Sequence, residues 1–90
     1  MIMEQKTRID KWLWAARFYK TRSAAAKAVT GGRVRINAQR VKPAHFLQVN
    51  DQVRISKGLY EFIIDVIAIS DKRGPAKQAQ LLYQETPASI

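Results

Sequence analysis

The first part of the chain has a helical spacing of apolar residues. Four of them recur at intervals of three and four, which places them on one face of an α-helix: Ile9, Trp12, Leu13 and Ala16. Thr7, with Asp10 three residues later, resembles a capping box. We therefore expect a helix that begins after Thr7, ends at about Phe18 and buries this face.

A second helical pattern follows the polar connection 19–22. Ser23 is the expected N-cap of a helix over about Ala24–Thr30. Its inward stripe consists of small and β-branched residues: Ala25, Ala28 and Val29. Gly31 and Gly32 should end this helix, because glycine readily adopts the left-handed conformation found at helix ends.

From residue 33 the period changes to two, which is typical of half-buried strands. Val34 and Ile36 should face the core, and a turn at 37–40 should lead into a short second strand that starts at Val41. Residues 53–56 alternate again. The long segment Leu59–Ile69 is rich in β-branched residues but alternates poorly, so we expect a bulge or burial on both faces.

The C-terminal part has another helical pattern. Pro75 can occupy the first position of a helix that runs to about Gln84. Its apolar stripe would be Ala76, Ala79, Leu82 and Tyr83. The order helix, helix, strands, helix predicts an α+β domain, with two short N-terminal helices packed on a small antiparallel sheet and a short C-terminal helix.

The distribution of charge adds a prediction of function to this prediction of the fold. The 90 residues suffice for one small domain with a net charge of +9. Ten of the sixteen basic residues, and one acid, lie between Arg8 and Lys42, so that segment alone carries +9. Such a local excess of positive charge predicts a polyanionic partner, and nucleic acid is the most common one.

Five of these cations should share one surface around the second helix and the strand after it: Lys20, Arg22, Lys27, Arg33 and Arg35. Thr21 and Ser23 would add hydroxyl donors at the start of that helix, where free backbone N–H groups also attract anions. The alternative is an ordinary solvated charged face. We favour phosphate binding because charges on such a face normally alternate in sign, whereas here they do not.

The aromatic residues could stack on nucleic-acid bases or pack inside the protein. Trp12 lies on the core stripe, so we expect it to be buried. For Trp14 we favour packing, under the C-terminal helix. The pattern leaves both roles open for Phe18 and Tyr19.

Other chemistries have little support in the sequence. There is no cysteine, the seven acids are scattered, and His45 is a lone histidine in a predicted loop. We therefore expect no enzymatic activity, no catalytic residue, no metal site and no cofactor. No segment resembles a secretory signal or a membrane span, and a chain without cysteine suits a reducing compartment. We expect a cytoplasmic protein that does not bind membranes.

Two stretches carry a resemblance to a known family. The first is RIDKWLWAARFYKTRSAAAKAV followed by GGRVRIN and VKPA; the second is KRGPA with LYQET near the C-terminus. Together they resemble the ribosome-associated fifteen-kilodalton heat-shock protein family of bacteria, within the superfamily of RNA-binding domains first described in ribosomal protein S-four. The resemblance spans about Arg8–Thr86. The chain departs from the pattern at Ala38 and Asn50, where glycine is usual.

The resemblance implies a bent sheet and RNA binding without catalysis. It divides the chain into an N-terminal tail (1–7), an S-four-type RNA-binding domain (8–70) and a C-terminal helix with a tail (71–90). The implied partners are ribosomal RNA, large ribosomal subunits that carry a nascent chain on tRNA, and peptidyl-tRNA, in stress-related recycling of ribosomes. The implied RNA-facing residues are Arg8, Lys11, Arg17, Lys20, Thr21, Arg22, Ser23, Lys27, Arg33, Arg35 and Lys42.

Three other functions agree with parts of the pattern. The domain could be the guide module of an RNA-modifying enzyme, such as a pseudouridine synthase or a methyltransferase. It could be a salt-resistant protein-interaction module that uses Trp14, Phe18 and the C-terminal helix. DNA binding is a less favoured alternative to RNA binding. We expect a monomer.

Overall fold

The computed structural model describes residues 7–70 and 73–86. Its elements follow one another in the order α1 (Ile9–Ala15), α2 (Arg22–Thr30), β1 (Val34–Ile36), β2 (Gln39–Arg40), β3 (Gln52–Lys57), β4 (Tyr60–Val66), α3 (Ala76–Ala79), the 3₁₀ helix η1 (Gln80–Leu82) and β5 (Tyr83–Glu85).

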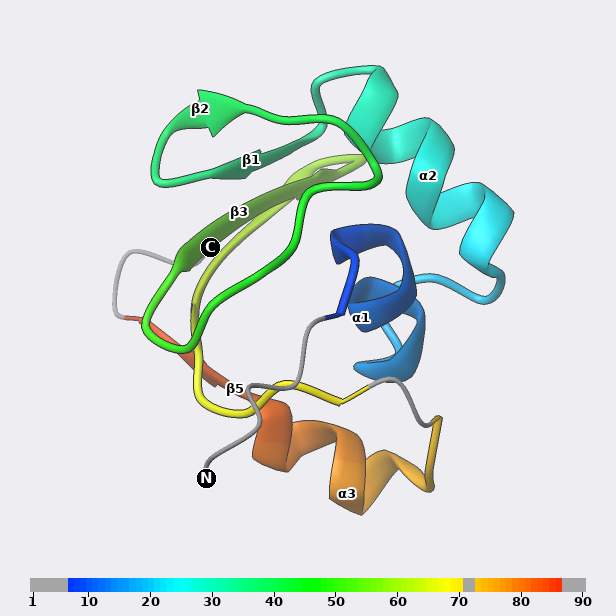
Figure 1. The fold of residues 1–90 in the computed structure, drawn as a ribbon, viewed down its shortest axis with the longest axis vertical. Coiled ribbons are helices and arrows are strands. Elements are labelled where there is room, and N and C mark those ends of the chain that lie inside the picture. Colours follow the sequence, from blue (N-terminus) through cyan, green and yellow to red (C-terminus); the bar gives the residue numbers. More distant parts are fainter. Residues whose placement is uncertain (1–6, 71–72, 87–90) are drawn as a thin grey trace, which may run out of the picture.

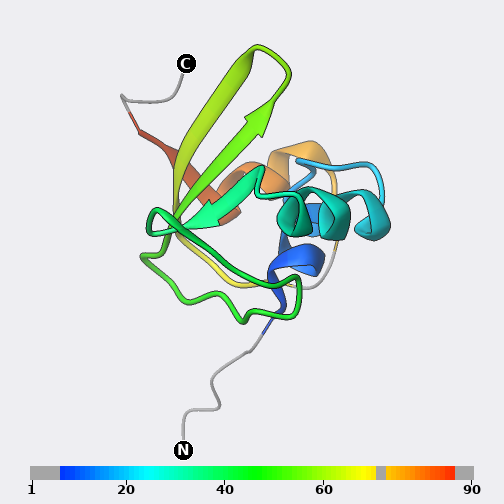
Figure 2. The same cartoon turned by 90° about the horizontal axis from the view of Figure 1, so that it is seen from above.

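The strands form one antiparallel sheet in the order β2-β1-β3-β4-β5. Helices α1 and α2 pack against each other and lie on the same side of this curved sheet, while α3 lies below α1 (Figure 1). The hairpin of β3 and β4 projects away from the helices (Figure 2). These features confirm the predicted α+β class with helices on a small antiparallel sheet.

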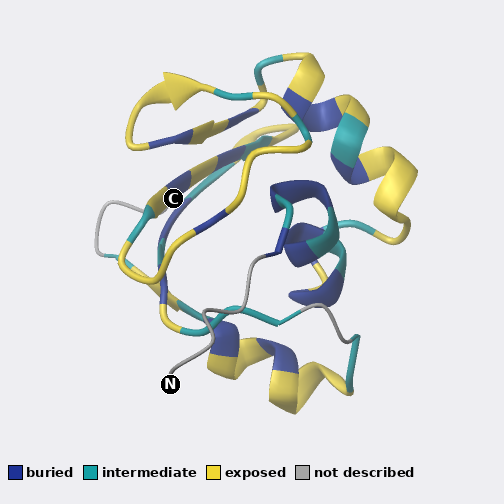
Figure 3. Cartoon of the chain, viewed as in Figure 1, coloured by how far each residue is buried: buried dark blue, intermediate teal, exposed yellow. Residues whose placement is uncertain are grey.

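The core lies between the helices and the inner face of the sheet (Figure 3). The predicted stripe of α1 is buried, and Trp12 is fully enclosed, with its indole Nε1 donating to the Ala68 carbonyl at 2.9 Å. Val34, Ile36 and the inward stripe of α2 are buried as well. Trp12 therefore packs in the core, as predicted, because its indole N–H finds a partner there.

Both predicted helix caps are wrong by one or two residues. The N-cap of α1 is Arg8, and the Thr7 side chain makes no capping hydrogen bond. The N-cap of α2 is Thr21 instead of Ser23, because the Thr21 Oγ1 accepts a hydrogen bond of 3.0 Å from the Ala24 amide. Helix α1 ends at Ala15, three residues before the predicted Phe18, and Arg17 then adopts a φ of 66° that ends the helical path.

The strands largely follow the predicted alternation. β1 buries Val34 and Ile36, but β2 begins at Gln39 instead of Val41. β4 ends at Val66 and pairs with β3 in an unbroken register, so it has no bulge against that strand. It is instead buried on both faces, since the neighbouring Ile63 and Ile64 are both enclosed.

The C-terminal helix is much shorter than predicted. Pro75 is the N-cap of α3, which has four residues, and η1 continues for three more before the chain turns into β5. β5 pairs with β4, so the last described segment joins the sheet. Ala79 and Leu82 of the predicted stripe are buried, whereas Ala76 is exposed.

Candidate nucleic-acid interface

The connection between α1 and α2 is held in place by cations from distant parts of the chain. Arg73 donates from Nη1 to the carbonyls of Trp14 at 2.8 Å and of Tyr19 at 3.0 Å. Lys57, at the end of β3, donates to the Phe18 carbonyl at 2.6 Å. Carbonyls at the end of α1 and in the connection after it thereby gain charged donors. The connection that carries Lys20 and Thr21 is thus a supported loop.

The first turn of α2 presents the next predicted site residues. Thr21 caps the helix, while Arg22 and Ser23 occupy its first two positions with exposed side chains. Ser23 makes no capping bond, so its hydroxyl is not engaged at the helix start in the way that we predicted. Free amides at a helix N-terminus favour anions, and the adjacent Arg22 increases this positive potential.

Asp10 ties the two helices together beneath this surface. Its carboxylate is buried and accepts from the Lys11 amide at 2.7 Å and from Arg8 Nη2 at 3.0 Å. Arg22 Nε lies 3.6 Å from the same carboxylate. The Arg8 and Arg22 side chains remain 42% and 44% exposed, so each guanidinium can still reach a ligand. Asp10 therefore orients two of the predicted RNA-binding arginines.

Replacing Asp10 with Asn tests this role, because a positioning role and a simple charge effect predict opposite changes in the affinity for RNA. Removal of a negative charge from a basic segment should strengthen binding to a polyanion if only the net field matters. If Asp10 orients Arg8 and Arg22, the Asp10→Asn variant instead binds RNA about threefold to tenfold more weakly, because about 1 kcal/mol of preorganisation is lost. Titration of labelled ribosomal RNA measures the difference, and affinity above that of the unchanged chain would contradict the positioning role.

The outer face of the sheet carries a row of three arginines, of which we predicted only Arg35 as a site residue. Arg35 in β1 is the direct cross-strand partner of Arg40 in β2 and of Arg54 in β3. Directly opposed residues share a face, and opposed like charges are destabilising. Two of the three have partners, since Arg54 lies 3.4 Å from Glu61 and Arg40 donates to the Thr30 carbonyl at 2.9 Å.

Arg33 and Arg35 come together at a shallow depression of about 210 Å³ on this face. Arg54 and Ser56 line it as well, together with Gly32 and Glu61. Gly32 has a φ of +79°, and a Cβ there would lie 3.2 Å from the Arg40 Nε, so glycine suits this passage from α2 to β1. The depression presents guanidinium and hydroxyl donors in a space that a phosphate group could enter.

Arg33 lies close enough to the α1–α2 connection to affect Tyr19 electrostatically. Burial raises the pKa of the Tyr19 phenol above its ordinary value, and the positive charge of Arg33 partly opposes that rise. Lys57 Nζ lies 4.9 Å from the centre of the Tyr19 ring. Tyr19 therefore lies near two cations, Arg33 just before β1 and Lys57 at the end of β3.

The remaining predicted site residues occupy more varied positions. Lys20 and Lys27 are exposed on the connection and on α2, and Lys42 is exposed just after β2. Arg17 is exposed, but its Nε donates to the Gly74 carbonyl at 2.8 Å, so it also supports the C-terminal segment. Lys11 is half-buried on α1. That all these residues form one RNA-binding surface stays a prediction.

The exposure of the aromatic residues separates core packing from possible stacking. Phe18 is buried against the Trp12, Phe62 and Tyr83 rings. Trp14 is half-buried and packs against the core, with the Arg73 guanidinium carbon 5.5 Å from its ring centre. The predicted packing of Trp14 is therefore confirmed, with Arg73 rather than a long C-terminal helix on its ring.

The described residues offer no other obvious chemistry. Within 7–70 and 73–86, no group of three or more His, Asp and Glu side chains could hold a metal ion. In the same two ranges, no helix has the length and apolar character needed to cross a membrane. His45 is exposed, and Asp65 is half-buried in β4.

Comparisons with known proteins agree with this geometry. The S4 domain family matches residues 7–53, which cover α1 to the start of β3. Heat shock protein 15 homolog of Haemophilus influenzae is 48% identical over 97% of this chain. The chain spans 66% of that relative's length, slightly less than two thirds.

Two further matches extend the comparison. A solved structure described as trimeric Vibrio cholerae Heat Shock Protein 15 shares 48% identity and superposes with a TM-score of 0.92, covering 94% of this chain and 86% of that one. A Streptococcus pneumoniae protein named RQC P-site tRNA stabilizing factor is 34% identical over 71% of this chain and 73% of its own length. The chain belongs to the S4 domain family and, within it, to the heat shock protein 15 family.

Proposed function

We propose that this chain is a non-catalytic protein that binds ribosomal RNA in the cytoplasm. Its binding surface comprises the α1–α2 connection, the first turns of α2 and the outer face of β1. The observation that carries this proposal is the placement of exposed cations on these elements, while two acids of neighbouring elements, Asp10 in α1 and Glu61 in β4, are paired with arginines. Phosphate contacts and the shape of the RNA dominate recognition, since the deep groove of duplex RNA is hard to read.

The eleven predicted RNA-facing residues contribute unequally within this proposal. Arg22, Lys27, Arg33 and Arg35 contact phosphates, with Thr21 and Ser23 beside them. Arg54 joins this group because it lines the same depression as Arg33 and Arg35. Arg17 contributes less to binding because part of its guanidinium is used by Gly74.

The RNA in question belongs to large ribosomal subunits that still carry a nascent chain on tRNA. Two relatives support this finer proposal through their names, one a heat shock protein and the other a factor that stabilises P-site tRNA in ribosome quality control. The function would be to help recycle such stalled subunits under stress.

Sedimentation of tagged chain with ribosomal subunits tests this finer proposal. We expect the chain to travel with large subunits, and to be retained to higher salt on subunits that carry peptidyl-tRNA than on vacant ones. Small subunits serve as the control for general attraction to RNA. Equal retention on small and large subunits would contradict the proposal.

The oligomeric state of this chain is a separate question. We predicted a monomer from the sequence, whereas the Vibrio structure is described as trimeric. Sedimentation equilibrium of the free chain decides between a mass near 10.3 kDa and three times that mass.

A further inference from the structure

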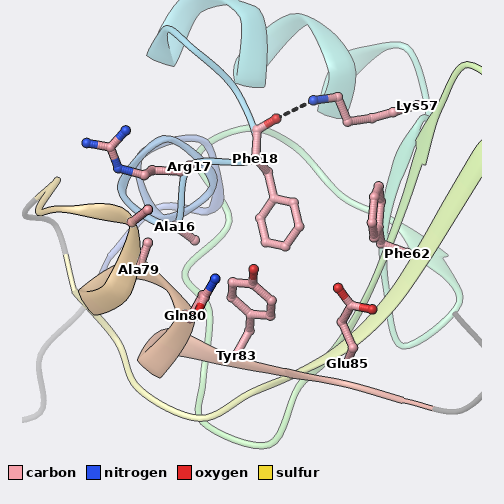
Figure 4. A pocket seen from close by; sticks show the side chains of 10 residues that line it. Ala16, Arg17, Phe18, Lys57, Phe62, Ala79, Gln80, Tyr83 and Glu85 are labelled. Carbon is pink, nitrogen blue, oxygen red and sulfur yellow. Dashed lines mark hydrogen bonds between the residues drawn. The ribbon is translucent and has the colours of Figure 1, made fainter.

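A pocket of about 260 Å³ opens between the sheet and the C-terminal segment (Figure 4). One wall is the end of α1 and the connection after it, a second is the β3–β4 hairpin, and a third is formed by α3, η1 and β5. Most of its lining lies outside residues 7–53, the part of the chain that the S4 domain family matches. The pocket is thus a product of the C-terminal segment closing against the hairpin.

Three aromatic residues line it: Phe18, Phe62 and Tyr83. The Phe18 ring centre lies 5.9 Å from that of Phe62 and 4.8 Å from that of Tyr83, and these three rings converge in the pocket (Figure 4). Phe18 is nearly enclosed, whereas Phe62 and Tyr83 are only half-buried, so parts of their surfaces remain accessible. Such rings suit a flat, aromatic ligand.

Polar groups surround the rings. The Gln80 amide and the Glu85 carboxylate line the pocket and can pair with the donor and acceptor edge of a ring system. Glu85 lies close enough to Tyr83 that its negative charge adds to the rise that burial produces in the phenol pKa. Lys57 supplies a positive charge at the rim, where its Nζ is fixed on the Phe18 carbonyl.

Lys57 links the pocket to the α1–α2 connection, which belongs to the proposed RNA-binding surface. Lys57 contacts both the pocket and the Tyr19 ring, and Tyr19 directly precedes Lys20 and Thr21. A strand of RNA whose phosphates lie on the first turn of α2 would therefore pass beside this opening. Its bases could turn from the backbone into the pocket without leaving the cationic surface.

We propose that this pocket binds one unstacked nucleobase of the RNA that the basic surface holds by its phosphates. The inference rests on the proposed RNA-binding function and adds a base-specific contact to it. The pocket volume suits a single ring system. It is about 260 Å³, below the range of roughly 300–1,000 Å³ typical of pockets that enclose drug-sized ligands. Stacking on Phe62 and Tyr83 holds the base, and Gln80 and Glu85 contact its edge.

Phe62→Leu removes an aromatic face but keeps an apolar side chain of similar size. Stacking contributes about fivefold or more to affinity per base, so we expect Phe62→Leu to weaken binding to large-subunit ribosomal RNA at least about fivefold. The slope of log K against log salt should not change, because no phosphate contact is lost. Tyr60→Leu, two residues earlier on the same strand and outside the pocket lining, is the matched control and should bind like the unchanged chain.

Ala76→Leu blocks the pocket without removing any group from it. Ala76 is an exposed pocket residue in α3, and leucine is nearly as good a helix former as alanine, so this variant should fold. It should weaken RNA binding to a similar degree, also at constant slope. Binding within about twofold of the unchanged chain for both Phe62→Leu and Ala76→Leu would overturn the nucleobase proposal, as would an equal loss in Tyr60→Leu.

Two outcomes distinguish a nucleobase in the pocket from a protein side chain there, and from failure of the proposed RNA-binding function. If the pocket instead holds a protein side chain, both pocket variants keep full affinity for protein-free RNA and lose affinity only for intact subunits, which overturns the nucleobase proposal. If the unchanged chain binds RNA without salt dependence, the proposed function itself fails. If Phe62→Leu and Ala76→Leu lose affinity for RNA while the slope of log K against log salt stays constant, both the nucleobase proposal and the proposed function are supported.

Discussion

Replacing Arg22, Lys27 and Arg35 together with Ala should lower the affinity for large-subunit ribosomal RNA by about a hundredfold. Each charge-assisted phosphate contact contributes roughly 1 kcal/mol net, and three such losses correspond to about two orders of magnitude. The fold should survive, because all three side chains are exposed and Asp10 keeps Arg8 as a partner at 3.0 Å. Fluorescence titration with labelled RNA measures the affinity, and thermal melting monitors the fold.

The control for this variant changes charge elsewhere on the molecule. Lys77 is an exposed cation on α3, and Lys77→Glu lowers the net charge by two without touching α2 or β1. If the location of the charge matters, Lys77→Glu should change the affinity much less than the triple replacement. A loss that follows net charge alone, whichever residue is changed, would contradict a localised interface.

Replacing Arg73 with Ala should produce the largest loss of stability among single surface cations. Its Nη1 satisfies two carbonyls, at 2.8 and 3.0 Å, and its guanidinium lies over the Trp14 ring. Hydrogen bonds from a charged donor contribute about 1.5–3 kcal/mol, and a cation–π contact adds about 0.5–1 kcal/mol. Since one guanidinium serves all three contacts, we expect a loss of roughly 2–4 kcal/mol, or about 10 °C or more in Tm for a domain of this size.

Arg17→Ala is the matched comparison for Arg73→Ala. Arg17 is also an arginine that bridges the helix connection and the C-terminal segment, but it is exposed and makes one hydrogen bond, at 2.8 Å to the Gly74 carbonyl. Because solvent weakens this exposed contact, its replacement should cost only about 1 kcal/mol. Similar Tm values for the two variants would show that Arg73 does not brace the connection as the contacts indicate.

The apolar pattern correctly predicted which face of a single helix or strand is buried. Ile9 and Trp12 recur at helical spacing and are buried, and Val34 and Ile36 alternate and face the core. Cap residues were harder to predict, because Thr21 and Ser23 are both suitable N-caps two residues apart. The choice between them depends on where α2 packs against α1, which is a tertiary constraint.

The C-terminal segment illustrates how pairing overrides local spacing. Its apolar residues fit a helix as far as Tyr83, but Tyr83–Glu85 pairs with the free edge of β4 instead. An open strand edge gains backbone hydrogen bonds from such a partner. Nothing in the local sequence identifies which edge is free, so the helix was predicted too long.

The candidate site could be predicted only in part for a related reason. Clustered charge indicated α2 and β1, and Arg33 and Arg35 do line one depression. Arg54 was missed because it is distant in sequence and joins the site only through the register that pairs it with Arg35. The role of Asp10 was underestimated as well, since its spacing from Thr7 resembles a helix cap while its carboxylate in fact bridges Arg8 and Arg22.

The salt dependence of ribosomal RNA binding tests the central claim most directly. If the chain neutralises about five phosphates, log K should fall with log salt at a slope of roughly −3.5 to −4.5. In the Arg22, Lys27 and Arg35 triple replacement, the slope should become shallower by roughly 2 to 3, because three contacts are gone. A slope near zero for the unchanged chain, or equal slopes for the two proteins, would contradict a phosphate-binding surface on α2 and β1.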